Sequence, residues 1–563
     1  MKRKSFLLMM SIILVLSMFI AACSSKDAGS GEGKGEGNPE YGGHVTLSMF
    51  SAPKGLFNII FYEDQYDNYV LNYTTESLWA YDDKMQLTVP LLAEKWELSD
   101  DGKVVTITLR KDAKWSDGEP ITTDDFIFTW ETIASKEYTT EAKAPRYYAV
   151  EQIKGAAEMH EGKADSLSGV KKIDDHTMEV EFTEATANAL DNLWPSPIPK
   201  HVFDGMSVVE MKNSGASKNA GEIVTSGAFK FKEAKKNEYV ILEKNPHYYV
   251  EGRPYLDEIH LKVMTQDVAM GALKNEQIDF LGQINPAEFD TIKKMDHVTI
   301  KETQDLAYQY LGFKVKNPKL SNKKLRQAIS YGINRKAMVD GLLRGHGTVL
   351  NQHMPDASWA ANEKLKDAYP YDPEKAKQIL EEAGYKDVDG DGFVEDPDGK
   401  KLEISLDYPT GNPVRERSAI LIGEDLKKIG LNIKVKSPRD FESHSDAVQK
   451  DKVEMWLMGW SLVPDPDPSG IWGSKANWNY PRWENKKSDE LMKKAITELD
   501  QEKQKEIYAE WTELVSEEAP YVFLYTQNRI EAWNNRVKGV TFDWRGAIEH
   551  YKFIDWWIPK DLQ

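Results

Sequence analysis

Cysteine is nearly absent from this sequence of 563 residues, which contains Cys23 and no other. A single thiol excludes an intramolecular disulfide and any zinc site built on several cysteines. Basic residues are also in deficit, with 72 Lys and Arg against 91 Asp and Glu and a formal net charge of −19. We therefore do not expect the chain to bind nucleic acid or an anionic lipid surface through its charge.

Common catalytic motifs are missing as well. The sequence has no Gly-x-Ser-x-Gly elbow, no His-Glu-x-x-His pair and no phosphate-binding Gly-rich loop followed by Lys-Ser/Thr. The 11 histidines are scattered, and the closest central pair, His346 and His353, fits ordinary loop residues better than metal ligands. We expect no enzyme and no catalytic residues.

The first 22 residues have the pattern of a signal peptide. Basic residues at 2–4 precede an apolar run from Phe6 to Ile20, and small residues lead directly to Cys23. The segment resembles the signal of a bacterial lipoprotein, which implies that Cys23 is lipidated and that residues 23–43 form a flexible polar tether. A plain secretory signal with a stray cysteine is the alternative. We expect a protein anchored by a diacylglyceryl lipid at the extracellular face of the bacterial cell membrane.

The segment Met455–Trp472 contains the strongest sign of a binding site. Its apolar run, Met455–Leu462, is typical of a mostly buried strand. The run ends at Pro464–Pro468, where three of five residues lack a backbone N–H and cannot continue a sheet. This abrupt end predicts free backbone groups from Gly459 to Leu462 that could receive an extended peptide, with Trp460 and Trp472 as candidate walls. A core strand followed by a Pro-rich turn is the alternative.

The length of the chain requires two or three lobes, because a single core does not grow to this size. Helix and strand patterns alternate between about residues 305 and 520, which predicts a mixed sheet covered by helices. Asp100–Gly102 predicts a hairpin turn before a strand at 104–109. Either Thr122 or Thr123 is a candidate N-cap for the helix that follows, and Asn334 is a candidate N-cap further on.

A series of short motifs resembles the extracellular solute-binding proteins of bacterial peptide ABC importers, the oligopeptide- and dipeptide-binding family. The motifs follow in order over most of the body: 91–130, 225–231, 242–246, 253–257, 325–331, 334–335, 375–385, 426–430 and 519–525.

The resemblance implies an α/β fold of two lobes joined by a hinge, with an extra inserted domain. The implied parts are lobe I at 44–78, 192–303 and 520–563, the inserted domain at 79–191, and the second binding lobe at 304–519.

The resemblance also implies that Gly459, Trp460 and Ser461 face the backbone of a bound peptide. Tyr308 and Tyr310 are candidates to enclose the ligand, with core or hinge packing as the alternative. Tyr148 in the inserted domain is a weaker candidate.

The position at which several relatives hold the peptide α-ammonium with an aspartate is Val463 in this chain. Asp465 and Asp467 follow closely, and either could supply the missing charge. Capping of the following turn is the alternative for both residues.

Residues 387–398 follow the pattern of a twelve-residue calcium loop, with Gly392 at the sixth position. A strand is expected after the loop in place of a helix, so the motif is at best half an EF-hand. A solvated Asp-Gly turn is the alternative to structural calcium, whose candidate ligands are Asp387, Asp389, Asp391, Phe393, Glu395 and Asp398.

Together these features predict a monomeric lipid-anchored protein that captures oligopeptides and delivers them to an ABC permease. The same fold could instead bind an oligosaccharide or a metal chelate. A cell-surface hydrolase is the least favoured alternative.

Overall fold

The computed structural model describes residues 37–563, so the predicted signal peptide and Cys23 lie outside the described residues. The fold below is that of the compact unit Pro39–Gln563. No helix among residues 37–563 has both the length and the apolar content to span a membrane.

The first lobe is built around five strands, of which β1 lies far in sequence from the other four. The N-terminal strand β1 pairs in parallel with β10 and contacts β11, and β9 and β8 extend the sheet by antiparallel pairing. Helix α2 packs on this sheet through Val70 and Leu71, which share a core with Val45 and Leu47 of β1. The elements are β1 (His44–Met49), α2 (Gln65–Thr74), β8 (Phe229–Lys235), β9 (Tyr239–Lys244), β10 (Glu258–Val263), α8 (Gln266–Lys274), β11 (Phe280–Leu281), α9 (Phe289–Ile292) and β12 (Val298–Gln304).

The second lobe has a sheet in the order β16-β15-β17-β13. Its strands are β13 (Tyr308–Phe313), β14 (Gly347–Val349), β15 (Glu403–Asp407), β16 (Asn432–Val435) and β17 (Met455–Trp460). Successive side chains of a strand point to opposite faces. Accordingly, Met455 and Leu457 join one core and Trp456 and Met458 join another.

Helices cover both faces of this second sheet. The core that contains Met455 is completed by α10 (Lys323–Gly332), α11 (Arg335–Leu342), α12 (Pro373–Glu382) and α13 (Pro413–Lys428). The core that contains Trp456 is completed by α14 (Phe441–Gln449), α15 (Ser469–Trp472), α16 (Lys486–Thr497) and α17 (Gln501–Glu518). The predicted mixed sheet between helices is confirmed, and Asn334 caps α11 by accepting from the Ala337 N–H.

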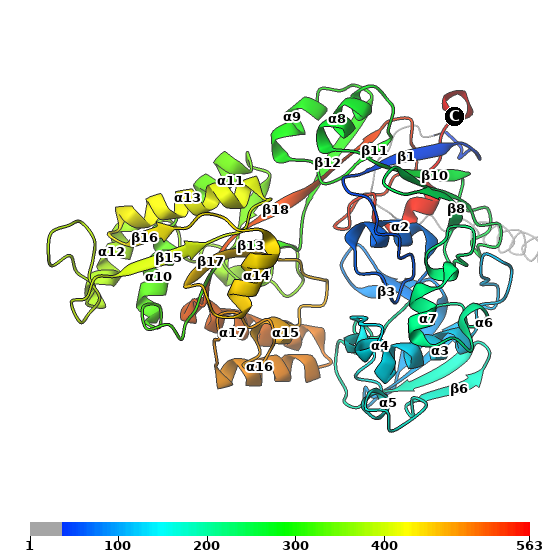
Figure 1. Ribbon diagram of the computed structural model, residues 1–563, viewed down its shortest axis with the longest axis horizontal. Coiled ribbons are helices and arrows are strands. Elements are labelled where there is room, and N and C mark those ends of the chain that lie inside the picture. The colour runs from blue at the N-terminus through cyan, green and yellow to red at the C-terminus, as the bar shows by residue number, and fades with distance from the viewer. Residues whose placement is uncertain (1–36) are drawn as a thin grey trace, which may run out of the picture. The chain divides into compact units, whose positions relative to one another are not determined.

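One long strand, β18 (Tyr521–Asn534), belongs to both sheets. Its first part pairs with β13 and β14, and its last part pairs with β11 and β12. Figure 1 shows β18 running between the two groups of strands. The strand begins next to the implied domain boundary at residue 520 and continues the second lobe's sheet before it enters the first.

A separate four-stranded sheet has the order β4-β5-β7-β6 and is packed by α3. The predicted hairpin is confirmed, since β4 pairs with β5 across the turn at Gly102. Thr122 forms a capping box with Asp125 at the start of α3. The elements are β2 (Trp79–Tyr81), β3 (Leu87–Pro90), β4 (Ala93–Leu98), β5 (Val104–Leu109), α3 (Thr123–Ala134), α4 (Lys136–Thr140), α5 (Ala156–His160), β6 (Val170–Asp174), β7 (Thr177–Glu181), α6 (Lys200–Phe203) and α7 (Val208–Asn213).

Candidate ligand-binding site

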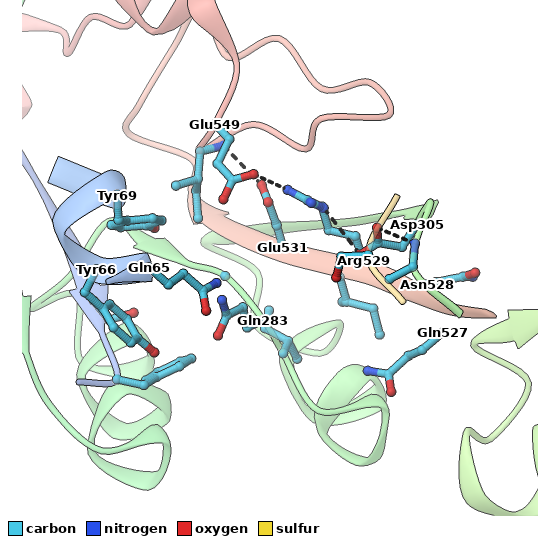
Figure 2. Close-up of a pocket in the computed structure, with 18 of the residues that line it drawn as sticks. Gln65, Tyr66, Tyr69, Gln283, Asp305, Gln527, Asn528, Arg529, Glu531 and Glu549 are labelled. Atoms are coloured by element: carbon cyan, nitrogen blue, oxygen red, sulfur yellow. Dashed lines mark hydrogen bonds and ion pairs between the residues drawn. The ribbon is translucent and has the colours of Figure 1, made fainter. Parts of the chain in front are cut away.

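A cavity of about 410 Å³ lies where β18 passes from one sheet to the other. Its walls come from β1 and α2 of the first lobe, from β13 and the two residues directly after β17 in the second, and from the middle of β18. Figure 2 shows this pocket. Uncharged polar side chains are prominent in its lining: Ser48, Gln65, Gln283, Gln309, Ser461, Gln527 and Asn528.

The predicted free strand edge lies next to this cavity. On one side, β17 pairs with β13 along its whole length, from Met455 opposite Phe313 to Trp460 opposite Tyr308. On the other side, β15 reaches only Met455 and Trp456. The second edge of residues 458–460 therefore has no strand partner within the part of the chain that the structure describes. Ser461 and Leu462, directly beyond β17, line the cavity.

Trp460 is held in a row of aromatic rings. Its ring is stacked with Tyr310 at 6.3 Å and with Tyr480 at 5.6 Å between centroids, and Trp478 lies 6.2 Å away. The residue is half-buried, and Gly459 before it is also half-buried. A methyl group at Gly459 would lie 2.9 Å from the Tyr308 carbonyl oxygen, so glycine permits the close approach of β17 and β13 here. Both predicted contact residues thus sit at the open edge, whereas Ser461 is exposed beside the cavity.

The tyrosine candidates occupy three different environments. Tyr308 lines the cavity, but its hydroxyl donates to Nδ1 of buried His353 at 2.8 Å. Trp472 donates to the same nitrogen at 3.1 Å, and burial lowers the pKa of His353 to about 3, so this imidazole is neutral. Tyr310 is fully buried and packs against Tyr521 at 3.9 Å, while Tyr148 is 59% exposed. Neither Tyr310 nor Tyr148 lines the cavity.

Asp465 and Asp467 lie beside the inserted-domain segment at residues 188–191. Asp465 accepts from the Asn188 side chain at 3.0 Å, and Asp467 accepts from the N–H and hydroxyl of Ser469. Burial, followed by the charges of Asp191 and Asp467, raises the pKa of Asp465 to about 7. Neither carboxylate lines the cavity.

The sequence reasoning did not single out a group of charged side chains at one end of the cavity. Arg529 of β18 contacts Glu549 at 2.7 Å and lies 3.9 Å from Asp305. Glu531, two residues along the same strand face, is 3% exposed and accepts from the N–H groups of Ala547 and Ile548. Burial raises the pKa of Glu531 to about 7, against the opposing effects of those two hydrogen bonds and of Arg529.

Arg415 is a second functional candidate that the sequence reasoning missed. It lies at the start of α13 and donates from Nε to the side-chain oxygen of Gln309 at 2.9 Å. No carboxylate lies within ion-pair distance of its guanidinium among the described residues. Burial lowers the pKa of Arg415. Gln309 lines the cavity, so Arg415 lies directly behind the cavity wall. A guanidinium without a carboxylate partner at this place can bind an anionic group.

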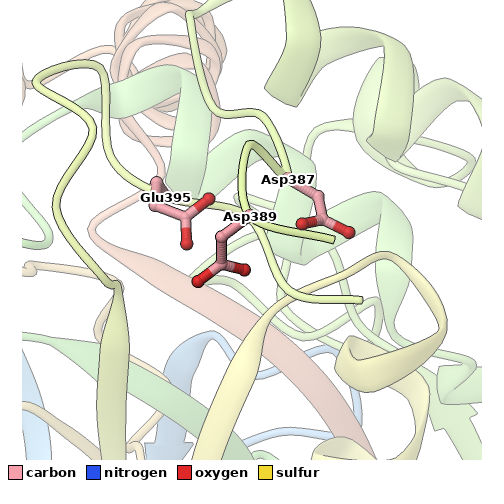
Figure 3. A group of neighbouring side chains, drawn as sticks. All are labelled: Asp387, Asp389 and Glu395. Atoms are coloured by element: carbon pink, nitrogen blue, oxygen red, sulfur yellow. The ribbon is translucent and has the colours of Figure 1, made fainter. Parts of the chain in front are cut away.

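The acidic loop at 387–398 brings together three of its six candidate ligands. Oxygen atoms of Asp387, Asp389 and Glu395 lie within 4.8 Å of one another, as Figure 3 shows for the three side chains. Glu395 is 4% exposed, whereas the other two are exposed. The ammonium group of Lys401 contacts Asp389 and Asp391, each at 2.8 Å. Asp398 pairs with Lys400 at 3.4 Å instead.

The two sheets, the shared strand and the cavity between them define a two-lobed ligand-binding protein. Residues 88–481 match the model for the bacterial extracellular solute-binding proteins, family 5, which is more than half of the chain. The chain belongs to this family. The resemblance inferred from the short motifs is thereby confirmed, and the family consists of solute-binding proteins.

Individual relatives agree with this assignment. The oligopeptide-binding protein AppA of Bacillus subtilis is 31% identical over 99% of this chain and all of its own length. The structure of that AppA with a nonapeptide superimposes with a TM-score of 0.73, 29% identity, and coverage of 93% of this chain and 100% of its own. NikZ of Campylobacter jejuni, in complex with Ni(L-His), gives a TM-score of 0.72 at 26% identity, covering 91% and 99%. The expected two-lobed α/β fold is confirmed.

Proposed function

We propose that the protein is the lipid-anchored binding component of an ABC importer and that it captures extracellular oligopeptides in the cavity beside β17. The observation that carries this proposal is the open edge of residues 458–460 next to a cavity lined by amides. A guest peptide added to that edge would gain main-chain hydrogen bonds that do not depend on its sequence. The nonapeptide in the B. subtilis relative supports a peptide as the ligand.

The uncharged polar lining favours a site that accepts peptides of many different sequences. Glutamine and asparagine side chains offer both donors and acceptors, and water can bridge them to different peptide side chains. Gly459, Trp460 and Ser461 form the proposed contact with the peptide main chain. Tyr308 supports this edge from the neighbouring strand, and its hydroxyl is used in the core rather than on the ligand.

Isothermal titration calorimetry with modified peptides tests the main-chain mode. An N-methyl scan removes one backbone donor at a time, and we expect at least one position to lose about tenfold in affinity. Alanine-to-serine changes at the same positions should alter affinity by less than about threefold. Equal sensitivity to both kinds of change would contradict main-chain recognition.

Native mass spectrometry of the purified protein should show a series of co-purified peptides. A discrete sugar or metal complex would instead support another ligand, and cleavage of a peptide mixture would indicate a hydrolase.

The membrane anchor is the second part of the proposal. Cys23 carries the diacylglyceryl group after removal of residues 1–22, and the protein acts as a monomer outside the membrane and delivers peptide to the permease. Detergent phase partitioning of the mature protein tests the anchor. The natural chain should enter the detergent phase and Cys23→Ser should stay in the aqueous phase. Equal partitioning of both would contradict lipidation.

The acidic loop supports a structural calcium ion as an additional proposal. Asp387, Asp389 and Glu395 place oxygens within reach of one cation, and carboxylates are preferred calcium ligands. Lys401 would have to leave Asp389, since an ammonium and a calcium ion compete for the same oxygens. Thermal unfolding in calcium and in chelator tests this site. A rise in Tm in calcium that Asp389→Asn abolishes supports it, and identical curves contradict it.

A further inference from the structure

The Arg529 end of the cavity differs from the rest of its lining in carrying charge. The lining contains three carboxylates, Asp305, Glu531 and Glu549, and a single basic residue, Arg529. Arg529 is already engaged, by Glu549 at 2.7 Å, by Asp305 at 3.9 Å and by the Arg545 carbonyl at 2.9 Å. The positive charge of Arg529 is therefore already paired with carboxylates of the protein.

We propose that this end of the cavity is a cation subsite, which takes an ammonium or guanidinium group of the bound ligand between Tyr69 and the carboxylates Glu531 and Glu549. The proposal rests on the peptide-binding function proposed above and adds the chemical class of group that the cavity selects. Such a group is either the α-ammonium of a peptide or the side chain of a lysine or arginine within it.

The arrangement of side chains supports a cation. In the view of Figure 2, Glu549 and Glu531 lie between Tyr69 and Arg529. Burial raises the pKa of the Tyr69 hydroxyl, and the neighbouring carboxylates Glu531 and Glu549 raise it further. A tyrosine ring face together with carboxylate oxygens is a favourable environment for ammonium and guanidinium groups.

A second, independent observation comes from β1, which also lines the cavity. Ser48 of β1 lines the same cavity and is 6% exposed, and its hydroxyl has no hydrogen-bond partner among residues 37–563. An unpartnered buried hydroxyl is costly, because desolvation is not compensated. A ligand group with several donors, such as an ammonium, can bond to this oxygen.

Neighbouring elements do not supply a competing cation to the subsite. Arg545 directs its guanidinium to Asp543, the His550 ring and the Tyr81 carbonyl, and it does not line the cavity. Arg415 is near Gln309 on the second lobe and also lies outside the lining. Asp305 and Glu549 outnumber Arg529 even when Glu531 is protonated, so the lining carries more negative than positive charge and a cationic group is the one it stabilises.

Two matched pairs of pentapeptides test the subsite and separate the two sources of charge. The first pair is acetylated at the N-terminus and has lysine or norleucine at the central position. The second pair is penta-alanine with a free or an acetylated N-terminus. We expect the charged member of at least one pair to bind about tenfold more tightly in calorimetry, and the pair that responds identifies the source. Affinities equal within twofold in both pairs would overturn the subsite.

Variants connect that preference to particular residues. Glu549→Gln and Glu531→Gln keep the size of each side chain, and in the second variant the new amide oxygen can still accept from the N–H groups of Ala547 and Ile548. We expect both to reduce the preference for the charged peptide at least threefold while binding of the neutral peptide persists. Glu506→Gln, on the exposed side of α17, is the matched control and should keep the full preference. An unchanged preference in both cavity variants would overturn the assignment.

The outcomes distinguish this subsite from the proposed function. If neutral and charged peptides bind equally well, the protein is a peptide receptor without a cation subsite. If no peptide of either charge binds, the peptide-binding function itself is wrong, and the subsite is refuted with it.

Discussion

The substitution Asp465→Asn distinguishes two possible roles of the Asp465 carboxylate, which follows β17. It could hold a ligand ammonium, or it could serve only as a hydrogen-bond acceptor within the protein. From the sequence, Asp465 is one of two candidates to hold the α-ammonium of a peptide, together with Asp467, and capping of the following turn is the alternative. In the structure the carboxylate accepts from Asn188 of the inserted domain and lies outside the cavity lining. The first role requires the negative charge, whereas the second is served equally well by an amide.

The size of the effect follows from the pKa of Asp465, which burial and two neighbouring carboxylates raise from 3.8 to about 7. A rise of about three units corresponds to at most about 4 kcal/mol. Since the side chain is half-buried, we expect about half of that, roughly 2 kcal/mol. A raised carboxyl pKa means that the folded state binds the proton more tightly, so stability is lost as pH rises from about 4 through 7.

Asp465→Asn removes this loss. At pH 4 the variant and the natural protein should have the same Tm, and at pH 8 the variant should be more stable by roughly 2 kcal/mol, or about 2 °C for a chain of this length. Its amide oxygen can replace one carboxylate oxygen, and the Asn188 amide can turn to accept from its nitrogen. Differential scanning fluorimetry at both pH values measures the difference.

The binding assay decides between the two roles. If Asp465 only joins the inserted domain to the second lobe, calorimetry at pH 8 should give unchanged or tighter affinity for a peptide with a free N-terminus. A loss of about tenfold for that peptide, with no loss for its acetylated form, would refute our reasoning and establish Asp465 as the ammonium ligand.

Three further predictions concern the binding strand and its surroundings. Trp460→Ala should weaken peptide affinity at least tenfold, roughly 1.4 kcal/mol, because it removes a ring of the aromatic row; an unchanged Kd in calorimetry would place Trp460 outside the site. Glu531→Gln should remove the stability loss between pH 5 and pH 8 that a pKa of about 7 causes, at most about 3 kcal/mol, and parallel pH profiles in urea unfolding would contradict this. Gly312→Ala should destabilise the second lobe by more than about 1 kcal/mol, because its methyl group would lie 2.4 Å from the Trp456 ring; a Tm equal to that of the natural protein would show that the ring moves freely.

Local features of the fold were predictable because each depends on a few neighbouring residues. Thr122 and Asn334 cap helices in the structure, since a side-chain oxygen before a helix satisfies free N–H groups irrespective of the rest of the chain. The hairpin at Gly102 follows equally from local turn chemistry. The open edge of β17 was foreseen from the prolines that follow it, because proline cannot extend a sheet.

The charged end of the cavity could not be predicted in the same way. Asp305, Arg529 and Glu549 come from separate segments, and they meet only because β18 carries Arg529 past the end of β12 and the 546–549 turn. In a chain with 91 acidic residues, no local pattern marks Asp305, Glu531 and Glu549 as neighbours. The sequence does contain one indication of this site. Arg529 and Glu531 are charged residues two positions apart in a long apolar strand, and a buried charge requires a partner.

The position of these charges on β18 links ligand binding to the relation between the lobes. The strand pairs with β13 at Tyr521–Tyr525 and with β12 from Asn528 onward, so its middle is the main-chain link between the two sheets. Residues 527–531, which line the cavity, occupy that link. A ligand in contact with them binds where the strand changes sheet, and its contacts depend on the angle between the two parts of the strand. We therefore expect the binding energy at this place to differ between lobe arrangements, which is the condition for a ligand to shift the population toward one of them.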